Sequence, residues 1–168
     1  MKVRRRLLGL GLAAFALGLD QIVKYAVLDS ASLAFGGVIE LAPWLDLVLV
    51  RNTGVSFGLL QAAPLWLLAA ITLLIVLWFA VWMWREARSA ACVGLGLIIG
   101  GAVSNLADRL GDGAVTDFID AHWGDWSWPT FNVADVAITV GAAILLLAAG
   151  FDRRETAPPK PARASTDP

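Results

Sequence analysis

Cysteine and histidine are nearly absent from this chain of 168 residues, which contains only Cys92 and His122 of these two types. A single cysteine forms no internal disulfide, and one distant histidine does not complete a structural zinc set with it. Charged residues make up only 16% of the sequence, and 13 basic and 14 acidic residues leave a formal net charge of −1. Because the basic residues form no extended stripe, the sequence argues against nucleic-acid binding, and we expect neither a metal nor a cofactor.

Uncharged apolar segments are what the chain has in abundance. Hydrophobic residues account for 58% of it, against about 45–50% in soluble proteins. The segment 64–84 has 21 residues without a charge, and as a helix it would be about 31 Å long, close to the hydrocarbon thickness of a bilayer. We therefore predict an all-α membrane protein with four transmembrane helices. The predicted spans are residues 7–28, 64–84, 89–107 and 131–151.

The distribution of Lys and Arg predicts the orientation. Ten of the 13 basic residues precede the first span, connect the second to the third, or follow the fourth, and such an excess marks the cytoplasmic side. Both termini are then cytoplasmic, and we expect the N-terminal segment to remain as the first span, not to be removed as a signal peptide. Residues 1–151 would form the membrane domain, and the proline-rich segment 152–168 a disordered cytoplasmic tail.

Two connections lie on the outer side of the predicted membrane domain. Residues 29–63 include the alternating segment 44–50, which predicts one or two strands. Residues 108–130 are acidic and rich in tryptophan. We interpret the acids of that second connection as solvated loop residues without a function; they are Asp112, Asp120 and Asp125.

Polar side chains occur at one depth in three of the predicted helices. At about 1.5 Å per residue, Asp20, Asn105 and Asp135 lie roughly 20–24 Å from the cytoplasmic ends of their spans. Ionisable and amide groups are costly inside a membrane, so each is a candidate functional residue. The spacing also keeps Lys24 on the face of Asp20, and Asn132 on the face of Asp135. The pattern predicts a polar pocket between helices that opens outward.

Simpler interpretations remain open for each of these residues. Asp20 and Lys24 are also compatible with a self-neutralising surface pair at a helix end. Asn132 is also compatible with an N-cap, with Asp135 at the third helical position. For His122 and Cys92 we favour plain packing roles.

Five short motifs occur in order along the chain, with the sequences DQIVK, NTGVSFG, GGAVSNLADR, VTDF and FNVAD. They begin at residues 20, 52, 100, 115 and 131. On a four-span topology this series resembles the lipoprotein signal peptidases, the signal peptidase II family of bacterial membrane aspartyl peptidases. The chain departs from the usual family pattern at three places, by small-for-small replacements that we expect to affect only local packing or substrate fit. These are Ser104 in place of Gly, Val55-Ser56 in place of an Ala pair, and Thr116 in place of Val.

The resemblance implies a fold, a reaction and a site. The fold would be four transmembrane helices with a small extracytoplasmic β cradle from the first connection, in the bacterial inner membrane. The reaction would be removal of the signal peptide from a prolipoprotein, just before a cysteine that carries a diacylglyceryl group, by a catalytic pair of Asp117 and Asp135 facing the extracytoplasmic side. The implied substrate-binding or supporting residues are Asp20, Lys24, Asn52, Gly54, Asn105, Asp108, Arg109 and Asn132.

The chemistry requires a base to activate water and an acid to protonate the leaving nitrogen, and two adjacent carboxyls supply both. Our main hypothesis is that Asp117, on the outer connection, folds back to meet Asp135, and that the substrate enters laterally from the lipid. Asp108 is the rival carboxylate. Other classes remain: an ion- or proton-coupled carrier, a serine protease pairing Ser104 or Ser56 with His122, and an inactive assembly or lipid-binding factor.

Overall fold

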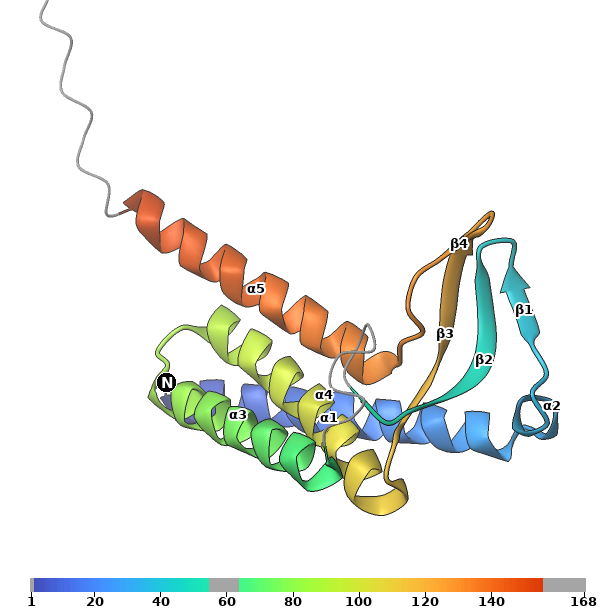
Figure 1. Ribbon diagram of the computed structural model, residues 1–168. Helices are drawn as coiled ribbons and strands as arrows, with labels where there is room; N and C mark the ends of the chain where they lie inside the picture. Colours follow the sequence, from blue (N-terminus) through green and yellow to red (C-terminus); the bar gives the residue numbers. More distant parts are fainter. Residues whose placement is uncertain (1, 55–63, 156–168) are drawn as a thin grey trace, which may run out of the picture.

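The computed structural model describes residues 2–54 and 64–155, and Figure 1 shows their arrangement. Four long helices pack together, and an antiparallel sheet stands at one end of the bundle, beside the C-terminal half of the first helix. The long helices are α1 (Lys2–Asp29), α3 (Leu65–Arg85), α4 (Ser89–Asp112) and α5 (Val133–Glu155). A single short turn of helix, α2 (Ala31–Ala34), links the first helix to the sheet.

Three of these helices, α1, α3 and α4, are long and apolar enough to cross a membrane. The apolar stretch described in α5, Val133–Ala149, is shorter than that criterion requires. Its helix begins two residues after the predicted start at 131, because Asn132 bonds to the first turn from outside it. The helix also continues to Glu155, so the first residues of the predicted disordered tail are helical, while residues 156–168 lie outside the described part of the chain.

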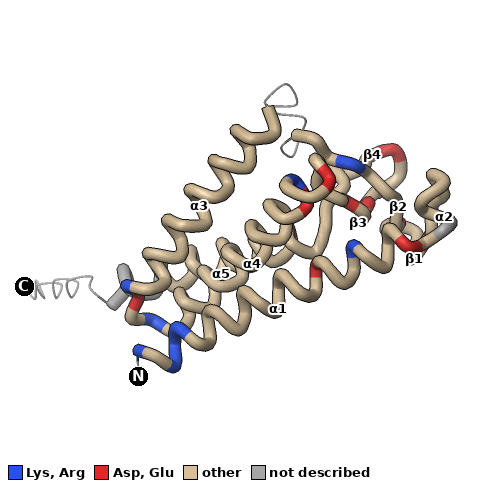
Figure 2. Tube along the Cα trace, turned by 90° about the horizontal axis from the view of Figure 1, so that it is seen from below, with Lys and Arg blue, Asp and Glu red and all other residues tan. Residues whose placement is uncertain are grey.

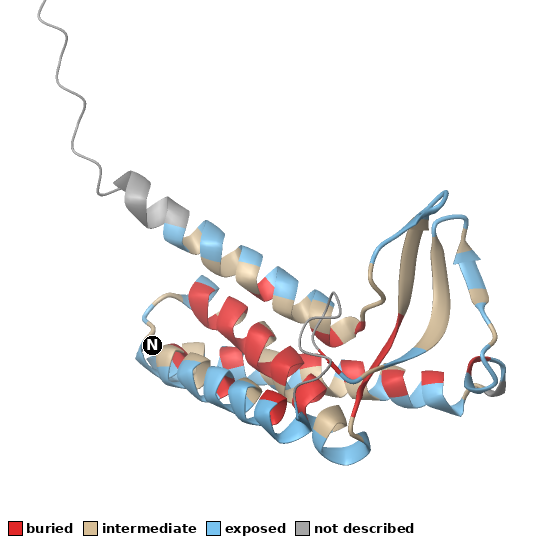
Figure 3. Cartoon of the chain, viewed as in Figure 1, coloured by how far each residue is buried: buried red, intermediate tan, exposed pale blue. Residues whose placement is uncertain are grey.

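Helix α4 is the centre of the bundle and is buried along most of its length (Figure 3). It contacts α1, α3 and α5. A Cβ atom at Gly100 would overlap the carbonyl oxygen of Ala13 in α1, and a Cβ at Gly141 of α5 would lie 2.5 Å from the carbonyl oxygen of Gly94. Helices in lipid gain stability mainly from close packing, so these glycines allow the approach that holds the polar side chains of three helices together.

The sheet has four strands in the order β1-β2-β3-β4, each antiparallel to its neighbour. The strands are β1 (Ile39–Ala42), β2 (Leu45–Asn52), β3 (Val115–Trp123) and β4 (Trp126–Ser127). The strands expected around residues 44–50 are thus confirmed. Two expectations were wrong: the second connection is largely strand and turn, and the sheet is built from both connections and not from the first alone.

A small apolar cluster fixes the sheet to the bundle. Phe118 of β3 packs with Val27 of α1 and Leu33 of α2, and all three are at least 95% buried. Asp117 is the residue before Phe118, so this packing also sets the position of the Asp117 carboxylate. The second core cluster lies between α3 and α4 and includes Cys92, which is fully buried, as the packing interpretation predicts.

Basic residues gather at the end of the molecule farthest from the sheet (Figure 2). The Arg6 guanidinium donates 2.8 Å and 3.2 Å hydrogen bonds to the Trp84 carbonyl and lies 4.4 Å from the Trp84 ring centroid. Arg5 also donates to the Ala87 carbonyl. These contacts attach the start of α1 to the α3–α4 connection, where a hydrogen bond and the charge of Arg88 lower the pKa of Glu86 to about 2.

Candidate active site

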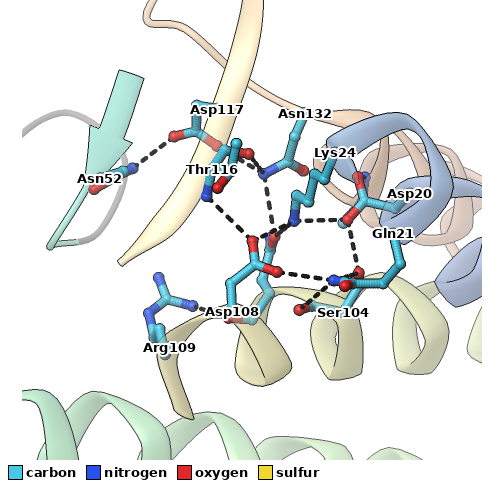
Figure 4. A network of polar contacts seen from close by, with 12 residues as sticks. Asp20, Gln21, Lys24, Asn52, Ser104, Asp108, Arg109, Thr116, Asp117 and Asn132 are labelled. Atoms are coloured by element: carbon cyan, nitrogen blue, oxygen red, sulfur yellow. Dashed lines mark hydrogen bonds and ion pairs between the residues drawn. The ribbon is translucent and has the colours of Figure 1, made fainter. Parts of the chain in front are cut away.

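A buried lysine is the centre of a polar network between α1, α4 and β3 (Figure 4). The Lys24 ammonium lies 2.6 Å from Asp20 and 2.7 Å from Asp108, and it donates a 3.0 Å hydrogen bond to Asn105. Lys24 is 2% exposed and Asp20 is fully buried. The simpler interpretation of Asp20 and Lys24 as a surface pair was therefore wrong, because neither charge is solvated.

Both carboxylates paired with Lys24 also accept other hydrogen bonds. Asp20 accepts from the Ser104 hydroxyl at 2.7 Å and from the Ala134 amide at 2.8 Å. Asp108 accepts from Gln21 at 2.8 Å and from the Thr116 amide at 3.1 Å. A buried carboxylate with a cation and two further donors has its charge fully compensated. These two residues thus tie α1 to α4, α5 and β3.

Asp117 and Asp135 are held differently, by amide donors. Asn132 donates a 2.7 Å bond from its side chain to Asp117 and a 3.2 Å bond from its backbone to Asp135. Asn52 donates to the second oxygen of Asp117 at 2.9 Å, and Asn105 donates to Asp135 at 3.0 Å. Within the described residues, no Lys or Arg forms an ion pair with either carboxylate. The two residues are therefore brought together on one asparagine without a direct counter-charge.

The electrostatic environment of Asp117 disfavours its ionised form. Burial raises the pKa of the Asp117 carboxyl to about 6, against an ordinary value of 3.8. The hydrogen bonds from Asn52 and Asn132 act in the opposite direction, and the nearby charge of Asp135 adds to the rise. Two neighbouring carboxyls repel each other when both are ionised, so one of them tends to keep a proton. The pKa values that a titration measures then belong to the pair and not to either residue.

Asn52, at the end of β2, links the Asp117 carboxylate to Gly54 by hydrogen bonds. Its side-chain oxygen accepts a 3.0 Å hydrogen bond from the Gly54 amide, and the Gly54 carbonyl accepts one of 3.1 Å from Arg109. Arg109 also donates to the Asn105 carbonyl, while its Nε is buried and has no hydrogen-bond partner among the described residues. The rest of the second motif, residues 55–58, lies outside the described part of the chain.

A cavity of about 470 Å³ opens beside Asp135. Its wall is mainly apolar and follows one side of α5 and the segment that precedes this helix. The lining residues are Trp128, Pro129, Thr130, Phe131, Asp135, Val136, Ile138, Thr139 and Val140. The cavity therefore joins a carboxylate of the site to an apolar helix face.

All the residues predicted for the site lie in this one network, but sequence reasoning missed some of its members. Gln21, Ser104 and Thr116 contribute hydrogen bonds, whereas the sequence predicted for Ser104 an effect on local packing or substrate fit. The hydroxyl of Ser104 donates to Asp20, while His122 lies beside Asp46 near the other end of the sheet. These positions contradict a Ser104–His122 protease; Ser56 lies outside the described residues.

Fold and site together define a multi-pass membrane protein that buries a network of carboxylates and amides where its helices meet an antiparallel sheet. Comparison with known proteins agrees. Residues 12–151 match the family model described as signal peptidase (SPase) II. The lipoprotein signal peptidase of Rhizorhabdus wittichii is 46% identical over 157 residues, which cover 91% of each chain. That of Beijerinckia indica is 41% identical over 160 residues, covering 93% of this chain and 95% of the relative.

The chain belongs to the signal peptidase II family. A solved bacterial membrane enzyme, determined by the in meso method, has a similar fold with a TM-score of 0.80 and 26% identity, covering 90% of this chain and 93% of its own. A second has a TM-score of 0.74 and 28% identity, covering 84% and 91%. The resemblance of the five motifs is thus confirmed, and membership of a peptidase family favours a hydrolase over the carrier considered as the alternative.

Proposed function

We propose that this protein removes signal peptides from bacterial prolipoproteins, cleaving just before a diacylglyceryl-modified cysteine, with Asp117 and Asp135 as the catalytic pair. Family membership supports the peptidase activity. One observation supports the choice of carboxylates: Asp20 and Asp108 share the charge of Lys24, whereas the contacts of Asp117 and Asp135 in the described structure are with amides. A carboxylate compensated by an ammonium is a poor base, so the other pair is available for chemistry.

In the proposed mechanism, one carboxylate of the pair takes a proton from a water molecule, which attacks the carbonyl carbon of the scissile peptide bond. The other carboxyl gives its proton to the leaving nitrogen, and the C–N bond breaks. One proton enters the pair and one leaves it, so the pair is again singly protonated, and transfer of that proton between the two carboxyls restores the starting state. The pKa of about 6 for Asp117 means that the pair retains a proton to a higher pH than an ordinary carboxyl would, and its titration belongs to the pair.

Asn52, Gly54 and Arg109 are proposed to hold the substrate backbone. The buried Arg109 Nε lacks a hydrogen-bond partner among the described residues. Hydrogen bonds through Gly54 and Asn52 link Arg109 to Asp117. A peptide carbonyl bound by this N–H would remove the cost of an unsatisfied buried donor. Lys24, Asp20 and Asp108 would support β3 and α5, the elements that carry the pair.

The apolar cavity beside Asp135 supports lateral entry from lipid. A substrate with acyl chains could place them along α5 while its peptide reaches the pair. We propose that α5 is the fourth membrane span, because it packs extensively against α4 and carries an exposed apolar face. We also propose that the basic end of the bundle lies on the cytoplasmic side of the inner membrane, so that the sheet and the active site lie on the extracytoplasmic side.

The test uses the full chain in detergent micelles or lipid vesicles, with a diacylglyceryl-modified prolipoprotein as substrate. Wild type should release the signal peptide, and mass spectrometry should place the cut just before the lipidated cysteine. Asp117→Asn and Asp135→Asn should each reduce turnover by about 1,000-fold or more, since each removes one proton-transfer group. The matched control is Asp112→Asn, because Asp112 is an exposed acid of α4 outside the network.

Two results would overturn the proposal. Turnover close to wild type in a folded Asp117→Asn or Asp135→Asn variant would remove the catalytic pair from the mechanism. Absence of cleavage by wild type, combined with ion flux across vesicles that contain it, would favour a carrier. Circular dichroism and thermal unfolding of each variant separate loss of chemistry from loss of structure.

A further inference from the structure

Three metal-ligating side chains meet on the sheet, away from the active site. Asp46 of β2 is the direct cross-strand partner of Asp120 in β3, and His122 follows two residues later on β3. Residues two apart on a strand point to the same face, as do direct cross-strand partners. Asp117 is three residues from Asp120, so it points to the opposite face. The cluster is therefore separate from the proposed catalytic pair.

The ligand atoms are close enough to share one ion. His122 Nδ1 lies 3.8 Å from Asp46 Oδ2, and one ligand atom from each of the three residues lies within 4.8 Å of the others. Metal–ligand distances of about 2.0–2.2 Å place tetrahedral ligands roughly 3.3–3.6 Å apart. Small side-chain rotations would therefore bring the three atoms to coordination distance. The site is half-buried, with the side chains of His122 and Asp46 25% and 18% exposed.

A bound cation would compensate the negative charges of the two carboxylates in this cluster. Like charges directly opposite each other on a sheet destabilise it, and Asp46 and Asp120 are such a pair. In the part of the chain that the structure describes, no Lys or Arg forms an ion pair with either of them. Among the described residues, the His122 imidazole has a nitrogen within 4.8 Å of an oxygen of each carboxylate, and it carries charge only when protonated. A divalent ion would neutralise the two carboxylates and use the neutral imidazole as its third ligand.

Neighbouring groups complete the environment of a metal site. Ser127 of β4 donates a 2.5 Å hydrogen bond to Asp120 Oδ1, which orients that carboxylate as outer-shell donors do in metal sites. His122 also lines a surface hollow of about 260 Å³ together with four other residues. Those residues are Trp44, Ala121, Trp123 and Trp126.

We propose that Asp46, Asp120 and His122 bind one divalent transition-metal ion of the Zn²⁺ class, which ties β2 to β3. One imidazole with two carboxylates suits Zn²⁺ and its neighbours better than Mg²⁺ or Ca²⁺, which prefer oxygen ligands alone. The same two strands carry Asn52 and Asp117 at their other ends, so the ion would stiffen the sheet that positions them. The sequence alone indicates no metal site, because Cys92 and His122 do not complete a zinc set and the carboxylate ligands become neighbours only through strand pairing.

The experiment is a zinc titration of the full chain, purified without a polyhistidine tag, stripped with EDTA and dialysed in detergent. Calorimetry should show one Zn²⁺ per chain, and Zn²⁺ should raise the Tm by about 3 °C or more. His122→Ala, Asp46→Asn and Asp120→Asn should each weaken Zn²⁺ binding by about tenfold or more. Asp125→Asn is the matched control, because Asp125 is an exposed acid in the neighbouring turn, and Mg²⁺ and Ca²⁺ serve as control ions.

The proposal fails if wild type takes up no Zn²⁺ at micromolar concentrations, or if His122→Ala binds it as wild type does. Substitution with Co²⁺ gives a readout that requires no variant, because its visible spectrum reports nitrogen and oxygen ligands of the wild-type site. A Co²⁺ spectrum with thiolate charge transfer would point to Cys92 and overturn the assignment. All these measurements are made without substrate, so they are independent of the proposed peptidase mechanism.

Discussion

Asn132 and Asp135 hydrogen-bond to each other in both directions. The Asn132 side-chain oxygen accepts from the Asp135 backbone amide at 3.0 Å, and the Asn132 backbone amide donates to the Asp135 carboxylate at 3.2 Å. This is the reciprocal pattern of a capping box at the start of α5. The capping interpretation and the functional interpretation of Asn132 are therefore compatible. The same residue caps a helix with its oxygen and holds Asp117 with its nitrogen.

The two roles of Asn132 predict a separation between variants. Asn132→Ser keeps a capping oxygen but loses the side-chain donor to Asp117 and Asn105, so prolipoprotein turnover should fall by about 100-fold while the cap of α5 is retained. In wild type the hydrogen bond from Asn132 lowers the pKa of Asp117. Its loss should therefore raise that pKa and move the pH–rate profile to higher pH. Asn132→Ala should lose about 1 kcal/mol of stability in addition. Equal turnover in wild type and Asn132→Ser would show that the amide donor has no part in the reaction.

The raised pKa of Asp117 predicts a pH dependence of stability. Between pH 3.8 and about 6 the folded protein retains a proton that the unfolded chain has released, so the stability of wild type falls as pH rises through this window. Asp117→Asn lacks that titration. The Tm of Asp117→Asn relative to wild type should therefore be higher at pH 7.5 than at pH 4, as measured by differential scanning fluorimetry in detergent. A constant difference would argue that the carboxyl is not perturbed.

Removal of the Lys24 charge should be strongly destabilising. Lys24→Met leaves Asp20 and Asp108 buried without a cation, which costs about 3–5 kcal/mol. The control is Arg51→Met, which breaks the ion pair of Arg51 with Asp112, whose side chains are 42% and 60% exposed. That exposed pair should contribute at most about 1 kcal/mol. Similar losses in the two variants would contradict the central role assigned to Lys24.

Close packing of α4 against α1 predicts different effects of the same substitution at two glycines. Gly100→Ala would place a methyl group against the Ala13 backbone, which cannot move aside as a side chain can, and should cost about 1–3 kcal/mol. Gly11→Ala meets no atom within 4 Å and should be neutral or stabilising by up to about 1 kcal/mol. Thermal unfolding of both variants measures the contrast, and equal Tm values would contradict the packing.

Much of the fold could be predicted from local pattern. Apolar length identifies the helices, because a membrane helix satisfies its own backbone and needs no distant partner. The alternation at residues 44–50 identified β2, because the side chains of a half-buried strand alternate between two faces with a period of two. Strand β3 was missed although Val115, Thr116, Phe118 and Ile119 are typical strand residues. Its acidic and aromatic neighbours gave the whole connection the composition of a loop.

The candidate site was predictable to a similar degree. Membrane depth brought Asp20, Asn105 and Asp135 to one level, and the family motifs added Asp117. Nothing local distinguished the roles of the four acids in the network, because that depends on which of them contact Lys24. The hydrogen bond from Ser104 to Asp20 likewise depends on which side of α4 packs against α1.

By itself the sequence determined that the chain contains apolar segments of membrane-spanning length and which polar residues share one face of a helix, since these properties depend on spacing along a single helix. Tertiary structure alone decided which carboxylates are neutralised by Lys24 and which are held by Asn52, Asn105 and Asn132. It also decided that Asp46 faces Asp120 and His122. The physical reason is that electrostatic interactions depend on distances of a few ångströms between residues far apart in the chain, and only the packed helices and paired strands set those distances.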